Sequence, residues 1–211
     1  MTFITFKRSI SNHNSTDMKR FISLVLFFFI ALRTSTLDAQ QLKMIEGDLS
    51  ALKSEKTIAL EFTYKPMRVG KYDAEEDYIN KKVAEMNKKE AGKGDGWAKS
   101  WIDARHEYYE PKFTTEFLRA SDKKIDSNSK YKMIFHTTFI EPGFNTGAIL
   151  IHKNPEIKGE IWVVETLNQS KVLAKFSIDK VVGREGYEFD TGRHVEGCYG
   201  IAGTEVGRFV K

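Results

Sequence analysis

The first hydrophobic pattern in the chain is an apolar run near its start. Residues 21–32, FISLVLFFFIAL, are apolar except for one serine, and two basic residues precede them. Twelve residues are too few to cross a bilayer, which takes about 20, but they match the core of a secretory signal peptide. Ala39 supplies a small residue before the expected cleavage site. We therefore predict a signal peptide from Met18 to Ala39 and a mature chain that starts at Gln40.

Alternating apolar positions predict the strands of the mature chain: residues 56–64, residues 131–140, and a hairpin of residues 160–166 and 171–181. In the first strand, every second side chain from Ile58 to Tyr64 is apolar, which is typical of a half-buried strand. The second strand is apolar on both faces, which indicates a central place in the sheet. Residues 149–151 can add a short extended piece.

Helical spacing of apolar residues predicts three helical regions. Asp73, with a glutamate three residues later, forms a capping box at the start of the first. The second starts after Asp95, and Pro111 either kinks it or opens a fresh helix to about residue 119. The closing helix, about residues 193–210, contains four glycines, each of which costs about 1 kcal/mol in a helix interior. We expect the glycines to let the backbone approach another element, most simply the sheet.

Together these elements predict an α+β (mixed α/β) fold in the order β-α-α-β-β-β-α. The expected architecture has two layers, with a mixed sheet of four to five strands and helices packed on one face. Residues 40–55 are mildly amphipathic, as in a short helix or a loosely docked arm. We expect a leader of residues 1–39, whose first seventeen residues precede the true start at Met18, and a single domain of residues 40–211.

Charge and cysteine content narrow the classes of function. The leader holds five Lys/Arg and two Asp/Glu, so its removal lowers the formal charge from +4 to +1. Such a balance gives no reason to expect a nucleic-acid partner. Cys198 is the one cysteine, so no intramolecular disulfide can form and the leader carries no lipid-attachment cysteine. We expect the protein in the periplasm or secreted, with no stable membrane span after cleavage.

Two long loops contain the candidate binding residues. The loops of residues 141–147 and 183–192 carry glycines together with acidic, aromatic and basic side chains, and such loops on a rigid sheet are common binding sites. Loops of this composition are also common as simple connections between strands and helices. The six candidate binding residues are Glu141, Phe144, Asn145, Arg184, Tyr187 and Phe189.

The remaining motifs favour structural interpretations, so we expect no catalytic residue, metal or cofactor. His106 and Glu110 are one helical turn apart, but two ligands do not make a zinc site. Cys198 follows His194 by four residues, yet a free cysteine is usually a small buried side chain. The glycine-rich residues 92–96 follow a helix and lack the phosphate-loop pattern. The aromatic group that includes Trp97 and Trp101 is expected in the core, although on the surface it could grip sugar or peptide.

Four stretches carry a resemblance to known proteins: the start ending LDAQ, then VGKYDAEEDYINKKVAEMNKKEAGKGDGW, TTFIEPGFNTG and FDTGRHVEGCYGIAGTEVGRFVK. In these stretches the chain resembles a group of small secreted Bacteroidetes proteins and brings no catalytic motif. Its element order is distantly similar to small α/β domains of envelope proteins, such as the curli secretion lipoprotein and the TolB amino-terminal domain. That similarity implies an assembly or interaction role, here without the lipidated cysteine of the lipoprotein.

The expected function is therefore a non-catalytic binding or assembly module of the bacterial cell envelope. Its partner would be another envelope protein or a glycan. The alternative is a hydrolase that acts on an envelope polymer through dispersed acids such as Glu141, Glu185 and Asp190. A cavity with two carboxylates and a raised carboxyl pKa would favour the hydrolase, whereas a flat apolar patch would favour a partner-binding module.

Overall fold

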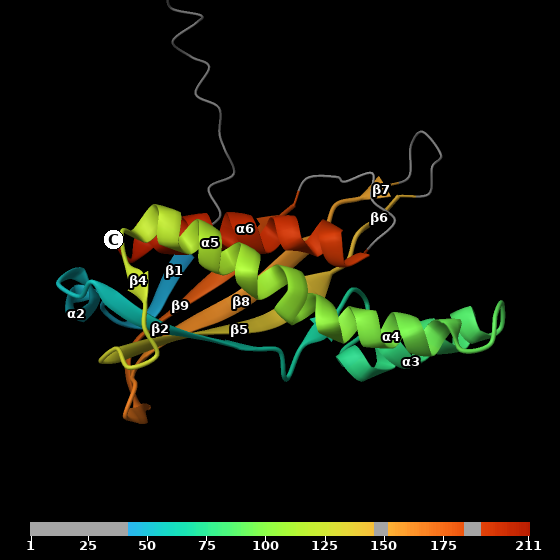
Figure 1. Ribbon diagram of the computed structural model, residues 1–211, viewed down its shortest axis with the longest axis horizontal. Helices are drawn as coiled ribbons and strands as arrows, with labels where there is room; N and C mark the ends of the chain where they lie inside the picture. The colour runs from blue at the N-terminus through green and yellow to red at the C-terminus, as the bar shows by residue number, and fades with distance from the viewer. Residues whose placement is uncertain (1–41, 146–151, 184–190) are drawn as a thin grey trace, which may run out of the picture. The chain divides into compact units, whose positions relative to one another are not determined.

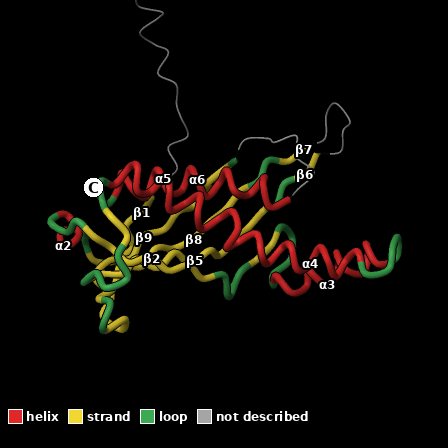
Figure 2. The backbone as a smooth tube through the Cα atoms, in the orientation of Figure 1, coloured by secondary structure: helices red, strands yellow, loops and turns green. Residues whose placement is uncertain are grey.

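The computed structural model describes residues 42–145, 152–183 and 191–211. These residues form a mixed sheet with helices on one face (Figures 1 and 2). The elements in chain order are β1 (Leu42–Gly47), α2 (Ser50–Lys53), β2 (Thr57–Thr63), β3 (Arg68–Val69), α3 (Glu75–Asn87), α4 (Lys93–Ala104), the π-helical turn η1 (Arg105–Tyr109), α5 (Glu110–Ser121), β4 (Lys124–Ile125), β5 (Tyr131–Glu141), β6 (Phe144–Asn145), β7 (His152–Lys153), β8 (Glu156–Glu165), β9 (Asn168–Val182) and α6 (Thr191–Phe209).

The main sheet has seven strands in the order β1-β9-β8-β5-β2-β4, and β3 pairs with β5 beyond the end of β2. β2 is parallel to its neighbours β4 and β5, whereas β8 pairs antiparallel with β5 and β9, and β9 pairs antiparallel with β1. The predicted fold class and element order are confirmed, as is the central position of residues 131–140. The sheet is wider than four to five strands because the short strands β1, β3 and β4 extend it.

Helices α5 and α6 lie side by side over one face of the sheet, whereas α3 and α4 extend past its end (Figure 1). The core lies between these two layers. The ring of Phe135 in β5 is 5.2 Å from that of Phe113 in α5 and 5.8 Å from that of Tyr199 in α6. All three side chains are buried, so one strand anchors both covering helices.

Residues 42–47 form a strand, so the prediction of a helix or loose arm there was wrong. β9 is fifteen residues long, and its outer edge pairs antiparallel with β1. Alternating positions Leu42 and Met44 pack against the core. The single helical turn α2 follows and ends at Lys53. Near its end, the ammonium of Lys123 donates to the carbonyls of Leu52 (2.7 Å) and Glu55 (3.0 Å). A cation suits the carbonyl end of a helix.

The first long helix starts one residue later than predicted. The N-cap of α3 is Ala74, and no side chain caps it. The carboxylate of Asp73 instead accepts a hydrogen bond from Arg68 (3.0 Å), so the predicted capping box does not form. Helix α4 continues through η1 into α5, where Pro111 occupies the first turn. The backbone stays helical at the junction residues Ala104, Tyr109 and Glu110. Pro111 therefore lies within one continuous helix that contains a π-helical turn, and it does not open a fresh helix.

Three of the four predicted glycines of α6, Gly200, Gly203 and Gly207, face helix α5, not the sheet as expected. A Cβ built at Gly203 would lie 2.3 Å from the carbonyl oxygen of Phe113, and one at Gly207 would lie 2.8 Å from that of Phe117. At Gly200 the nearest atoms belong to the flexible side chain of Lys112. The prediction of close packing was correct, but the element that packs against the glycines is α5 and not the sheet. The two helices approach until backbone meets backbone.

The sheet face opposite α5 and α6 carries polar side chains that pair across strands. Lys175 of β9 lies 2.9 Å from the carboxylate of Glu160 and covers the ring of Trp162. The neighbouring His136 accepts or donates a 2.5 Å hydrogen bond with the hydroxyl of Thr63. Burial lowers the pKa of His136, so its ring is neutral at pH 7. Cross-strand pairs of this kind stabilise a sheet.

Candidate functional site

Two of the predicted binding residues, Glu141 and Phe144, line one cavity of about 300 Å³. Asn145 follows directly in β6, where its backbone pairs with that of His152. The structure thus brings the described part of the first predicted loop to one place. The candidates from the second loop, Arg184, Tyr187 and Phe189, lie outside the described residues.

Four separate segments form the walls of this cavity, which we call the lysine–tyrosine cavity. They are the turn after β3, helix α3, the β5–β6 turn and β7, and the lining consists of residues 69–72, Tyr78, Lys82, residues 141–144 and Lys153. The β5–β6 turn needs its glycine: Gly143 has φ +73°, and a Cβ there would lie 2.7 Å from the carbonyl oxygen of Lys153. The glycine lets the β5–β6 turn lie against β7.

The carboxylate of Glu141 is held in place from two sides. Its Oε2 lies 2.5 Å from the ammonium of Lys153, and its Oε1 accepts a hydrogen bond from the backbone N–H of Gly143 (3.3 Å). The Lys153 side chain is more than half exposed, whereas that of Glu141 is mostly buried. The pair therefore presents an acceptor and a donor at the same wall of the cavity.

Two tyrosines connect the cavity to the core. The rings of Tyr72 and Tyr78 are 5.8 Å apart, and Tyr78 also lies 5.2 Å from Trp101 and 5.7 Å from Trp97. Trp101 is buried and Trp97 packs against the core, which confirms the core interpretation of this aromatic group. Burial raises the pKa of Tyr78, and the charge of Glu141 raises it further. The phenol is therefore neutral and can act as a hydrogen-bond donor.

Two further lysines border the cavity from different segments. The ammonium of Lys71 lies 5.6 Å from the centre of the Tyr72 ring, and that of Lys82 lies 6.0 Å from the centre of the Tyr78 ring. Both distances are within the range of a cation–π contact. With Lys153, the lining contains three ammonium groups and one carboxylate. The lining of the cavity therefore has more positive than negative groups, and its walls include two tyrosine rings.

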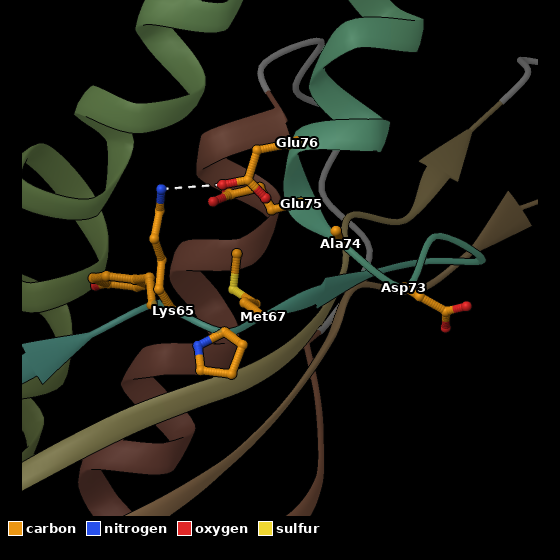
Figure 3. A pocket seen from close by; sticks show the side chains of 8 residues that line it. Lys65, Met67, Asp73, Ala74, Glu75 and Glu76 are labelled. Atoms are coloured by element: carbon orange, nitrogen blue, oxygen red, sulfur yellow. Dashed lines mark ion pairs between the residues drawn. The ribbon is translucent and has the colours of Figure 1, made fainter.

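A second cavity of about 350 Å³ lies on the other side of the turn before α3 (Figure 3). Its three carboxylates already have cationic partners. Lys65 lies 3.0 Å from Glu76, as the dashed line in Figure 3 marks, and Asp73 pairs with Arg68. The third carboxylate, Glu75, is bound by Arg105. This cavity consequently offers a ligand fewer available charges than the lysine–tyrosine cavity.

The ion pair between Glu75 and Arg105 is buried, and Glu75 belongs to the lining of the second cavity. The two residues are 3% and 8% exposed, and the carboxylate also accepts a 2.7 Å hydrogen bond from the indole N–H of Trp101. The guanidinium lies 4.4 Å from the centre of the Tyr64 ring. Arg105 stands in the π-helical turn η1. These contacts fix the start of α3, which contributes a wall to each cavity.

Four of the described carboxyl groups have a pKa shifted away from the range of a general acid. Where the pKa of such a group is shifted, it is lowered, and a general acid near neutral pH needs a raised pKa. The groups with a lowered carboxyl pKa are Asp48, Glu76, Asp122 and Glu160. Glu185 and Asp190, which the hydrolase hypothesis requires, lie outside the described residues.

The other candidate chemistry has structural explanations. Cys198 is buried, and burial raises the pKa of its thiol to about 12, which confirms the interpretation as a small core residue. The exposed ring of His106 forms a hydrogen bond with the carboxylate of Glu110 (2.9 Å). Among the described residues, no three His, Cys, Asp or Glu side chains form a group that could hold a metal ion. None of the described helices combines the length and hydrophobicity that crossing a bilayer requires.

The environment of Cys198 predicts slow labelling of the native protein. A buried thiol with a pKa of about 12 is protonated at pH 8 and closed to reagents. We expect 5,5′-dithiobis(2-nitrobenzoic acid) to react at pH 8 at least ~100-fold more slowly with the folded protein than with the protein in guanidinium chloride. Absorbance at 412 nm measures both rates. Equal rates would show that the thiol is accessible and reactive in the native state.

A scan of family models and a search of curated proteins give no match. The solved structures that are similar to the chain include the following two. The PelC dodecamer from Paraburkholderia phytofirmans matches with a TM-score of 0.37 and 8% identity, over 78% of this chain and 97% of that chain. Protein XCC0632 from Xanthomonas campestris, of family DUF330, matches with a TM-score of 0.32 and 12% identity, over 72% and 81%. Matches this distant bear on neither function nor partner, and the resemblance to secreted Bacteroidetes proteins stays a prediction.

The sequence predicts some residues of the lysine–tyrosine cavity and gives no indication of the others. The loop with Pro, two Gly and Asn pointed to Glu141 and Phe144. Tyr72, Tyr78 and Lys82 come from a turn and a helix some sixty residues earlier in the chain, and the sequence contains no motif that joins them to that loop. The parallel pairing of β3 with the end of β5 brings the two regions together.

Proposed function

We propose that this protein is a non-catalytic binding module of the bacterial cell envelope, and that it binds a glycan chain in the lysine–tyrosine cavity. The observation that carries the proposal is that side chains from separate segments of the chain meet at this cavity. An exposed aromatic ring, a fixed carboxylate and several ammonium groups from four segments border one cavity. The predicted signal peptide supports a location in the periplasm or outside the cell.

The chemistry of the lining suits a sugar. Phe144 is 46% exposed and offers an apolar face to a sugar ring. Glu141 can accept hydrogen bonds from hydroxyl groups, and Lys153 can donate to them. The volume of about 300 Å³ is at the lower end for small-ligand sites, so the cavity would hold a short segment of a chain.

The exposed apolar side chains give less support to a flat protein interface. A partner-binding surface of several hundred Å² needs them to be contiguous. Among the described residues they are instead distributed over six different elements or turns, as Ile45, Ile102, Ile125, Phe144, Leu167 and Phe209. The glycan proposal needs one exposed ring beside polar groups, and Phe144 is that ring.

We expect Phe144→Ser to weaken glycan binding by at least ~10-fold, because it removes the exposed apolar face. The matched control is Leu167→Ser, since Leu167 is fully exposed at the opposite end of β8. Calorimetric titration of each protein with a panel of bacterial envelope oligosaccharides measures the affinities. Binding that is unchanged in Phe144→Ser contradicts the proposed site, and new reducing ends in the recovered sugar contradict a non-catalytic role.

A further inference from the structure

We infer that the glycan is acidic, and that Lys71 and Lys82 bind carboxylate groups on its sugar rings. This inference deepens the proposed function and rests on it, because it names the ligand class of the same cavity. It starts from the charge of the lining, which is three ammonium groups against one carboxylate.

The two lysines approach the cavity from different elements. Lys71 belongs to the turn between β3 and α3, and Lys82 lies one helical turn after Tyr78 in α3. Each ammonium lies over a tyrosine ring, 5.6 Å and 6.0 Å from the ring centres. The ring contacts favour positions of the ammonium groups beside the cavity.

No carboxylate in the described part of the chain forms an ion pair with Lys71 or Lys82. Lys153, by contrast, is already paired with Glu141. The second cavity shows the balanced arrangement, because each of its three carboxylates has a cationic partner. Two unpaired cations beside tyrosine walls raise the local concentration of anions. A ligand with regularly spaced carboxylates would supply the missing partners.

The backbone of the cavity favours a sugar over an acidic peptide. A peptide that adds to a protein surface as a strand needs free backbone groups. The N–H of Gly70 is bonded to the carbonyl of Ile140 (2.8 Å), and that of Gly143 is bonded to Glu141 (3.3 Å). Recognition at these turns therefore falls to side chains, and Phe144 offers the apolar face that a sugar ring can cover.

The test compares three probes by calorimetric titration of the mature protein at low ionic strength. The probes are tetragalacturonic acid, its carboxyl-reduced neutral counterpart, and tetraglutamate. We expect the acidic sugar to bind at least ~10-fold more tightly than the other two, and its affinity to fall as salt is added. Lys71→Gln with Lys82→Gln should remove most of this preference, whereas Lys71→Arg with Lys82→Arg should keep it.

A matched control separates a local effect from net charge. Lys43→Gln with Lys124→Gln changes the charge equally at two exposed lysines of β1 and β4 and should leave the preference intact. Equal loss in the control overturns the inference, as does equal binding of the acidic and neutral sugars. Equal binding that Phe144→Ser abolishes leaves the proposed glycan site standing. Tight binding of tetraglutamate overturns the assignment to a sugar, and binding of none of the probes overturns both proposals.

Discussion

Replacement of Gly203 by alanine is expected to lower the melting temperature of the protein by about 4–8 °C. The new Cβ would lie 2.3 Å from the carbonyl oxygen of Phe113, which is helix backbone and cannot rotate away. Helices α5 and α6 must therefore separate, and their shared contacts with Phe135 and Tyr199 loosen. Overpacking of this kind costs about 3 kcal/mol at its upper end, more than the helix propensity of alanine returns.

Gly197 provides the matched control in the same helix. No heavy atom of the described residues lies within 4 Å of a Cβ built there, so Gly197→Ala should raise the melting temperature by about 2–4 °C through helix propensity alone. Scanning calorimetry of both variants measures the difference. If Gly203→Ala melts at the temperature of the parent protein, the backbone contact between α5 and α6 is not the reason for the glycines.

Replacement of Arg105 by methionine is expected to destabilise the fold by about 3–5 kcal/mol, because it leaves the buried carboxylate of Glu75 without its cation. Both residues are at most 8% exposed. Methionine keeps the length and apolar stem of the side chain, so the loss reports the charge more than the volume. Urea denaturation followed by tryptophan fluorescence measures the free energy of unfolding.

Two further variants test whether the effect belongs to the ion pair. Combining Arg105→Met with Glu75→Gln should recover part of the lost stability, since the amide can still accept the hydrogen bond of Trp101. Arg208→Met, which breaks an exposed pair with Glu205, should cost at most about 1 kcal/mol. Strict additivity of the Arg105 and Glu75 substitutions would show that the two charges do not depend on each other.

Periodicity predicted the long elements of this fold well. The alternation from Ile58 to Tyr64 and the apolar spacing in α6 each depend on one buried face, which a sequence records directly. The prediction for residues 42–47 was wrong because their strand forms on the free edge of β9, which lies more than a hundred residues away in the sequence. The prediction of a capping box at Asp73 was wrong for a similar reason, because the Asp73 carboxylate binds Arg68.

The candidate site likewise combines residues that the sequence predicted with residues that only the structure brings together. Glu141 and Phe144 were predicted because their loop has its own signal of glycines and proline. Lys71 and Lys82 carried no signal, since an unpaired lysine is defined by which carboxylates lie near it in space. The partner of the α6 glycines was also beyond the sequence: spacing showed that something lies close, but only the structure identifies α5.

The central claim is that the lysine–tyrosine cavity binds a glycan, and the most direct measurement is a map of binding by nuclear magnetic resonance. Backbone amide shifts of the labelled protein would be followed during titration with tetragalacturonic acid. We expect the largest shifts at residues 70–72 and at Glu141, Gly143 and Phe144, with weaker effects elsewhere. Shifts that concentrate around Trp162 on the opposite sheet face, with the cavity residues unchanged, would contradict the claim.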